Sequence, residues 1–428
     1  MPILIYTEKI TPRKTYIFNH ILVDILGIDY VFTTNQQEFE DYPEQKFSYS
    51  FLPFGDELHC KQHPFINENF VKEQKIAFEK VGIYRIPFAV TGGLFVFDIF
   101  SAAFYLLSRY EEYLPSEMDA HNRFQAENSV AYQCGFLDKP IIDCWAYQLL
   151  EKLKVRFPNI NFQTRKFTFT PTIDIDHPYY LRTETILRKN LKIVKSILKG
   201  DFTLLNRDPY DTYSYLKNIH RQYNLHPIYF FLLGNQHRFD AAPNLNAYQS
   251  AYKLLIQSIQ KYAKVGIHPS YQSNENIKIL TEEIKRLASA LSEKSITISR
   301  QHYLKLNLPE TYKNLLSVGI RADYTMGYAS QLGFRASTCT PFYWYDLHNE
   351  TCTDLKIFPF AVMDQTLKKY LKLNPESAID KINSLMDEVK KVNGTFISLW
   401  HNETLSNFAG WKNWRKVYDE MLEYASKT

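Results

Sequence analysis

Cysteine is sparse in this sequence, and its arrangement excludes two common kinds of protein. The five cysteines are an odd number and contain no C-x-x-C pair, which argues against a disulfide framework and against a cysteine-rich zinc site. Free thiols are typical of a reducing compartment. An excess of charge is also missing, because 50 basic and 46 acidic residues leave a formal net charge of only +4. This charge indicates neither a nucleic-acid partner nor a membrane partner.

Long apolar runs are absent as well. The nearest candidate for a membrane span, Leu94 to Leu107, is interrupted by Asp98 and leads directly into a polar stretch. The first residues lack a basic stretch followed by an apolar core, so no secretory signal is expected and we predict a cytoplasmic protein. The first half of the sequence contains no phosphate loop, dinucleotide-binding glycine motif or nucleophile elbow.

The chain has 428 residues, too many for one ordinary core, and two domains are therefore expected. Residues 1–164 mix short strands with helices and predict a smaller α/β domain of unknown role. Its expected strands are Ile3–Tyr6 and Tyr30–Thr33, and its expected helices are Lys14–Leu26, Phe97–Tyr113 and Ile142–Val155. Its charged residues are expected to form a solvated face or a salt-bridge face between the domains; they are Arg109, Glu111, Glu112, Asp119, Arg123 and Asp143.

Residues 165–428 change to a repeated order of strand, loop and helix, which predicts a parallel sheet that is either open or closed to a barrel. The expected strands are 167–174, 227–233, 265–271, 295–302, 319–323, 341–347, 355–363 and 395–401. The expected helices are 211–223, 248–263, 275–292, 309–318, 376–392 and 410–425.

The most informative segment is residues 172–178, an apolar run that ends in Asp174, Asp176 and His177. The residues before it alternate and are rich in β-branched and aromatic side chains, so both carboxylates are predicted at a strand end. Side chains two apart on a strand point the same way. Such a pair suits a general base beside a metal ligand, because a nearby cation keeps both ionised. Alternatively, the acids only cap a helix ahead of Pro178.

Further polar side chains gather at the predicted carboxyl ends of the strands. They are His237, His268, Arg300, His302, Asp323, His401, Asn402 and Glu403. Chemistry in parallel α/β proteins is located at these ends. An open doubly wound sheet would concentrate the site at one switch point, whereas contributions from nearly every strand favour a barrel.

These segments resemble the polysaccharide deacetylase family, the NodB-homology or carbohydrate esterase family 4 group, over roughly residues 165 to 428. Asp174 and Asp176 match the D-x-D form of its first motif, and residues 399–401 match L-x-H. Residues 300–303 resemble R-x-P-Y, with histidine in place of proline. The resemblance implies a distorted (β/α) barrel of NodB type that removes an N- or O-acetyl group from a carbohydrate in surface-polysaccharide metabolism.

The family's motifs also imply roles for single residues. Asp174 would be the general base held by Arg300, and His401 the general acid. Asp323 is the acid that would orient His401. Backbone amides near Tyr303 would stabilise the oxyanion, and the expected substrate-binding side chains are Tyr303, Tyr271 and Trp400. No nucleic-acid partner is expected.

The expected divalent metal, with zinc as the first candidate, depends on a motif that departs from the family. H-x-x-x-H reads here as His268 followed by Gln272, so only Asp176 and His268 match as ligands. The third ligand is then Gln272, His302 or His177, and glutamine is a poor zinc ligand compared with imidazole. We favour His302, because the fourth strand of such a barrel lies next to the third.

Three interpretations remain open. The chain is an active deacetylase with a rearranged site, a hydrolase acting on another carbohydrate or amide, or a metal-free carbohydrate-binding or scaffold pseudoenzyme. The presence of Asp174, Arg300 and His401 argues against the last. The first half, around Asp98 and residues 106–113, resembles an uncharacterised domain that precedes such deacetylase domains in some bacterial proteins.

Overall fold

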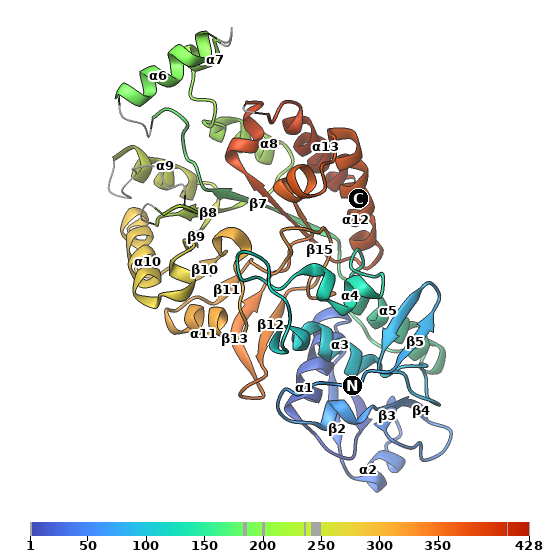
Figure 1. Ribbon diagram of the computed structural model, residues 1–428. Coiled ribbons are helices and arrows are strands. Elements are labelled where there is room, and N and C mark those ends of the chain that lie inside the picture. Colours follow the sequence, from blue (N-terminus) through green and yellow to red (C-terminus); the bar gives the residue numbers. More distant parts are fainter. Residues whose placement is uncertain are drawn as a thin grey trace.

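The protein is described from a computed structural model (Figure 1), which describes residues 2–182, 186–198, 202–234, 237–240, 250–408 and 410–427. Two sheets organise these residues, one of four strands near the N-terminus and one of nine strands in the remainder. A separate antiparallel hairpin joins β5 (Phe78–Val81) to β6 (Tyr84–Pro87). No helix in the described ranges is long and apolar enough to cross a membrane.

The first sheet is parallel, in the order β2-β1-β3-β4. Its strands are β1 (Ile3–Tyr6), β2 (Tyr30–Thr33), β3 (Lys46–Ser50) and β4 (Leu58–Lys61), so both strands predicted here are confirmed. The helices of this part are α1 (Pro12–Phe18), α2 (Gln36–Asp41), α3 (Ile99–Leu107), α4 (Val130–Gln133) and α5 (Ile141–Arg156). A π-helical segment, η1 (Asn19–Ile25), continues α1.

The helix predicted over Phe97–Tyr113 is shorter than expected. It ends at Leu107 and is followed by a separate 3₁₀ turn, η3 (Tyr110–Tyr113). Arg109 separates the two with a left-handed backbone, φ 56°. This conformation turns the Arg109 guanidinium into a buried group of ion pairs described below.

The second sheet has the order β12-β13-β11-β10-β9-β8-β7-β15-β14, and every pair is parallel except β12 with β13. The strands are β7 (Thr168–Ile175), β8 (Ile228–Leu232), β9 (Lys264–His268), β10 (Ile298–Ser299), β11 (Ala322–Asp323), β12 (Phe342–Asp346), β13 (Thr351–Ile357), β14 (Val362–Met363) and β15 (Thr395–His401). Each strand predicted in this half has a counterpart, and β15 has the predicted bounds.

The sheet curls as a half-barrel, so the prediction of a parallel arrangement with barrel order is confirmed while closure is not. The first strand, β7, lies between β8 and the last strand, β15, as a barrel requires. In the described residues β12 and β14 remain the outer strands. The inside of the curl holds its own apolar cluster, which includes Phe230, Leu399 and Phe360.

One predicted strand, residues 355–363, is two strands in the structure, β13 and β14. Pro359 separates them, and proline has no N–H to give to a sheet ladder. The next residue, Phe360, enters the cluster inside the curl. The chain therefore passes from one end of the sheet to the other within a few residues.

Helices fill most connections between these strands: α8 (Tyr213–Gln222), α9 (Ser250–Gln260), α10 (Ile277–Leu291), α11 (Glu310–Ser317), α12 (Pro375–Lys391) and α13 (Trp414–Ser426). They correspond to the six predicted helices, although the predicted positions 248 and 249 lie outside the described residues. Two further helices, α6 (Ile186–Ile197) and α7 (Thr203–Asn206), were not predicted.

Buried charge joins the N-terminal part to the curled sheet. Arg335 Nη2 lies 2.6 Å from Glu112 Oε2, and Arg109 Nε lies 2.7 Å from Glu112 Oε1. Arg109 also donates to the hydroxyl of Tyr328 at 3.0 Å. The expected salt-bridge face between the two parts is therefore present, and it is inaccessible to solvent.

Candidate metal and catalytic site

The carboxyl end of β7 brings two carboxylates to the mouth of the curled sheet. Asp174 pairs in register with His401 of β15, and Asp176 follows where the strand ends. Thr172 and Asp174, two apart, both contact Arg300 inside the sheet, as the alternation of a strand requires. Within the described residues, the chain after β7 continues as bends and not as a helix capped by either acid, so the alternative of a simple helix start is not what the structure shows.

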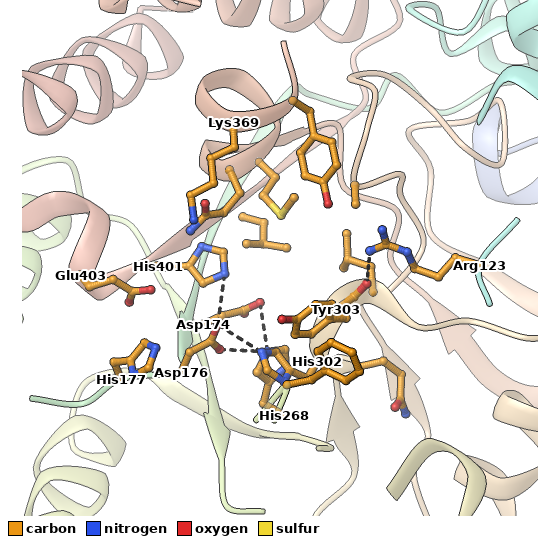
Figure 2. A pocket seen from close by; sticks show the side chains of 18 residues that line it. Arg123, Asp174, Asp176, His177, His268, His302, Tyr303, Lys369, His401 and Glu403 are labelled. Carbon is orange, nitrogen blue, oxygen red and sulfur yellow. Dashed lines mark hydrogen bonds and ion pairs between the residues drawn. The ribbon is translucent and has the colours of Figure 1, made fainter. Parts of the chain in front are cut away.

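Asp176, His268 and His302 meet at one point (Figure 2). One ligand atom from each lies within 4.8 Å of the other two. Asp176 Oδ1 is 3.2 Å from His268 Nε2, and Asp176 Oδ2 is 3.4 Å from His302 Nε2. β10 pairs with β9 through Ser299 and Ile267, which is the neighbourhood expected to bring His302 beside His268.

Both imidazoles are oriented by a hydrogen bond at the nitrogen away from this point. His268 Nδ1 lies 2.6 Å from the carbonyl oxygen of Arg300, and His302 Nδ1 lies 2.8 Å from Asp240 Oδ1. These partners can only accept, so each Nδ1 carries the proton. Each Nε2 is then directed toward Asp176, and after losing its proton this nitrogen would be the one available to bind a metal ion.

The charges at this point favour a cation. Burial alone would raise the pKa of Asp176, but His302 and His268 outweigh it and hold that pKa well below its usual range. Burial lowers the pKa of His302, yet Asp176 and Asp240 raise it to about 9. Asp176 Oδ1 is buried and accepts no hydrogen bond from a described residue. A metal ion would fit this donor set, one carboxylate and two imidazoles.

Asp174 lies beside this cluster and is held by a buried arginine. Arg300 Nη1 is 2.9 Å from Asp174 Oδ1 and donates to Thr172 Oγ1 at 2.6 Å. Its Nε donates to the carbonyl of Tyr324. Asp174 Oδ2 remains 3.7 Å from His268 Nε2, so this oxygen faces the cleft next to the imidazole.

His401 approaches from the opposite side and is oriented by Asp364. The ring Nδ1 donates to Asp364 Oδ1 at 2.8 Å, and Nε2 lies 3.6 Å from Asp176 Oδ2. Burial alone would lower the pKa of His401, but Asp364 and then Asp176 raise it well above the ordinary value. The imidazole is thus held in its protonated form.

The expectation that Asp323 orients His401 is wrong. Asp323 accepts hydrogen bonds from Ser299 and from the hydroxyl and N–H of Thr325. Its strand, β11, lies five positions from β15 in the sheet, whereas β14 is adjacent to β15 and places Asp364 directly beyond its end. Asp323 therefore fixes a local turn.

The cleft above these residues has a volume of about 330 Å³. Glu403 and His177 lie on one side of it and Arg123 on the other (Figure 2). Burial raises the pKa of Glu403 to about 8, despite the opposing effect of His401. A carboxyl group that is neutral at this position can donate a hydrogen bond into the cleft.

The N-terminal part of the chain contributes to this cleft. Arg123 is paired with Asp119 at 2.7 Å and donates from Nη1 to the carbonyl oxygen of Tyr303 at 2.5 Å. Tyr303 has a left-handed backbone, φ 60°, as does the next residue, Leu304. Arg123 therefore fixes a strained turn in the wall of the cleft from a position 180 residues away.

The three expected substrate-binding aromatics have different positions. Tyr303 lines the cleft. Tyr271 packs against Phe239, with ring centroids 4.5 Å apart, and is not among the described residues that line it. Trp400 is fully buried against Tyr418, so its prediction is wrong. The alternation of β15 turns His401 inward and Trp400 outward, toward α13.

The other two candidates for the third ligand are also placed. Gln272 is exposed at the start of a 3₁₀ turn and is not among the described residues that line the cleft. His177 lines the cleft but is not part of the group around Asp176.

Sequence reasoning missed Asp364, Asp240, Arg123 and Lys369, which line the cleft or orient residues in it. Asp364 had a signal, since it is the first residue after a predicted strand. Asp240 and Lys369 lie in connecting segments without strand or helix periodicity. Arg123 had been assigned to a salt-bridge face, and it does form one, with Asp119.

Known proteins resemble this chain only in part or distantly. A family model described as "Family of unknown function (DUF7033)" matches residues 3–158. No curated protein matches the chain. A protein of Mycobacterium smegmatis, provisionally named a polysaccharide deacetylase, is 14% identical at a TM-score of 0.41; the match covers 62% of this chain and 86% of that one. The 4-alpha-glucanotransferase of Thermococcus litoralis is 14% identical at a TM-score of 0.37, covering 62% and 38%. Both are too distant to say what this chain does.

Proposed function

We propose that this protein is a metal-dependent hydrolase that removes an N- or O-acetyl group from a carbohydrate. The observation that carries the proposal is the orientation of His268 and His302, each of which is hydrogen-bonded at Nδ1 and directs Nε2 toward Asp176. A divalent cation such as zinc, bound by these three residues, would polarise the acetyl carbonyl and lower the pKa of water.

The acid and base of the reaction are supplied by the two sides of this cluster. Asp174, positioned by its ion pair with Arg300, takes the proton of the attacking water as the water oxygen bonds to the acetyl carbon. His401, kept protonated by Asp364, gives a proton to the leaving nitrogen or oxygen as the bond to that carbon breaks. Acetate and the free amine or hydroxyl are the products.

The walls of the cleft support a carbohydrate as the bearer of the acetyl group. Phe239, Tyr303 and Tyr370 line it with aromatic rings, which provide flat apolar faces for sugar rings. Glu403, Gln365 and Lys369 add polar groups for hydroxyls. The volume is at the lower end of the range for small-molecule sites. We propose that the turn at Tyr303 supplies backbone amides to the oxyanion.

The test combines metal content with turnover. The full chain is purified, its metals are measured by mass spectrometry, and release of acetate is followed on a panel of N-acetylated and O-acetylated sugars. We expect a divalent metal near one equivalent, activity lost with a chelator and recovered with zinc, and no activity in Asp174→Asn or His401→Gln. Asp138→Asn and His348→Gln, which alter exposed side chains, are the matched controls.

Two results would reject the proposal. One is full acetate release by Asp174→Asn. The other is sugar binding without metal and without turnover across the panel, which would make the chain a carbohydrate-binding pseudoenzyme.

A further inference from the structure

Helix α6 is an unusual element of this fold because it buries nothing. It covers Ile186–Ile197 and contains no buried residue, whereas every other helix of comparable length places several side chains in a core. With α7 it stands apart from the rest of the molecule (Figure 1). Leu204 of α7 is buried.

Three apolar side chains of α6 and one just beyond its end form a stripe. Leu187, Leu191, Val194 and Leu198 follow the spacing i, i+4, i+7 and i+11, which places them on a single face of a helix. Leu187 is 78% exposed, Leu191 59% and Leu198 80%. Phe202 and Leu205, in and beside α7, are also exposed. Water-exposed apolar side chains in such a concentration mark an interaction site.

The stripe faces away from the molecule. The positions of α6 that are partly covered are Lys192, Ile193 and Ser196, on the other side of the helix. Lys192 Nζ donates to the carbonyl of Tyr180 at 3.1 Å and lies over the Tyr180 ring. This contact holds the helix on the side opposite the stripe, so the stripe faces the surroundings.

The charges around the stripe have one sign. Residues 186–198 contain Arg188, Lys189, Lys192 and Lys195 and no acidic residue. An apolar stripe flanked by basic side chains complements a surface with an apolar interior and negatively charged head groups. The helix is far too short to cross a bilayer, so it would lie along the surface.

We propose that α6, with the exposed residues of α7, is a docking surface for an anionic phospholipid bilayer. Because α6 lies at the edge of the molecule (Figure 1), a flat surface can reach the stripe. Tyr180, which holds α6, packs against Tyr210, and Tyr210 packs against His177 of the cleft. A docked molecule therefore has its cleft near the bilayer. The docking does not depend on the activity proposed above.

The first test is sedimentation of the full chain with vesicles. We expect the protein to sediment with vesicles of phosphatidylglycerol mixed with phosphatidylcholine, and about ten-fold less with phosphatidylcholine alone. High salt should weaken the binding, since part of the attraction is between charges.

Paired variants distinguish binding through this surface from non-specific binding to vesicles. Leu191→Glu should reduce vesicle binding about ten-fold, because it places a charge in the middle of the stripe. Leu254→Glu, on α9, changes a leucine of similar exposure, 63%, and should leave binding unchanged. Lys189→Glu should weaken binding to anionic vesicles, and Lys261→Glu, also exposed, should not.

Three outcomes would overturn the proposal: equal binding by Leu191→Glu and the parent, equal loss in Leu254→Glu, or a stripe that serves a second copy of the chain. The last would appear in analytical ultracentrifugation as a dimer that Leu191→Glu dissociates, with no binding to vesicles. Acetate release is measured separately on the parent and on the same surface variants, so a failure of the hydrolase proposal can be told from a failure of the docking proposal.

Discussion

Asp364 and His401 form one hydrogen-bonded unit at the edge of the cleft. Asp364 accepts the ring N–H of His401 through Oδ1 and the backbone N–H of the same residue through Oδ2, both at 2.8 Å. Thr404 donates to Oδ2 as well. The carboxylate therefore fixes the position, the tautomer and the charge of the imidazole together.

Replacing Asp364 should impair turnover through that imidazole. In Asp364→Asn the pKa of His401 falls, because the carboxylate that outweighs burial is gone. We expect kcat to fall about 100-fold or more, and the alkaline limb of the pH profile of kcat/KM to move to lower pH. Asp323→Asn is the comparison, since Asp323 does not contact His401; an equal shift of the alkaline limb in both variants would contradict the assignment.

His302 should be needed for metal affinity. His302→Ala removes one of the three converging ligand atoms, and we expect the dissociation constant for zinc to rise about 10- to 100-fold or more. Competition with a chromophoric chelator measures it. Gln272→Ala, which alters an exposed residue four positions after His268, should bind zinc as tightly as the parent does. Unchanged affinity in His302→Ala would remove this residue from the metal site.

Arg300 should be important for stability as well as for chemistry. In Arg300→Met the carboxylate of Asp174 stays buried without its partner, which commonly costs about 3 to 5 kcal/mol. Urea denaturation of the metal-free protein measures the loss. The double variant with Asp174→Asn should recover part of it, because the stranded charge is removed. Arg321→Met, at an exposed arginine, is the control, and a similar loss there would refute the explanation.

The loss of folding stability in acid should depend on His220, a buried histidine that is not among the described residues lining the cleft. Burial lowers its pKa to about 3, and its Nε2 lies beside the hydroxyl of Tyr418. Below about pH 6.5 this histidine is protonated in the unfolded chain but stays neutral in the folded chain. The free energy of unfolding therefore falls as the pH falls toward 3.

The size of this effect can be measured. Between about pH 7 and about pH 5 the linkage amounts to about 2 kcal/mol. His220→Gln should reduce the pH dependence by that amount in urea denaturation. His226→Gln, at an exposed histidine, should leave it unchanged, and an unaltered slope in His220→Gln would contradict the expectation.

The strands were the part of the fold that sequence predicted best. β15 was predicted with its bounds because a continuous apolar and β-branched run ends at a polar group, and the same rule placed Asp174 and Asp176. Whether the barrel closes was not predictable. It depends on the outer strands, and the chain passes from β13 to β14 through a short segment around Pro359 that has no strand or helix periodicity.

The site was predictable where a motif is local. Asp176 and His268 were found from motif positions, and His302 from strand order. The partners that orient them come from distant segments: Asp240 lies 62 residues from His302, and Arg123 lies 180 from Tyr303. Such contacts form only when the chain folds, and no fixed spacing in the sequence reveals them. The helix α6 did carry a helical pattern and was overlooked, since it follows a strand where a loop was assumed.

The contact from Arg123 to Tyr303, together with the buried pairing of Arg335 with Glu112, has a practical consequence for anyone who prepares fragments. Cutting the chain near residue 165 would expose a guanidinium that has lost its carboxylate and would release the turn that borders the cleft. A recombinant barrel fragment is therefore a poor substitute for the whole chain, and inactivity of such a fragment would not count against the intact protein.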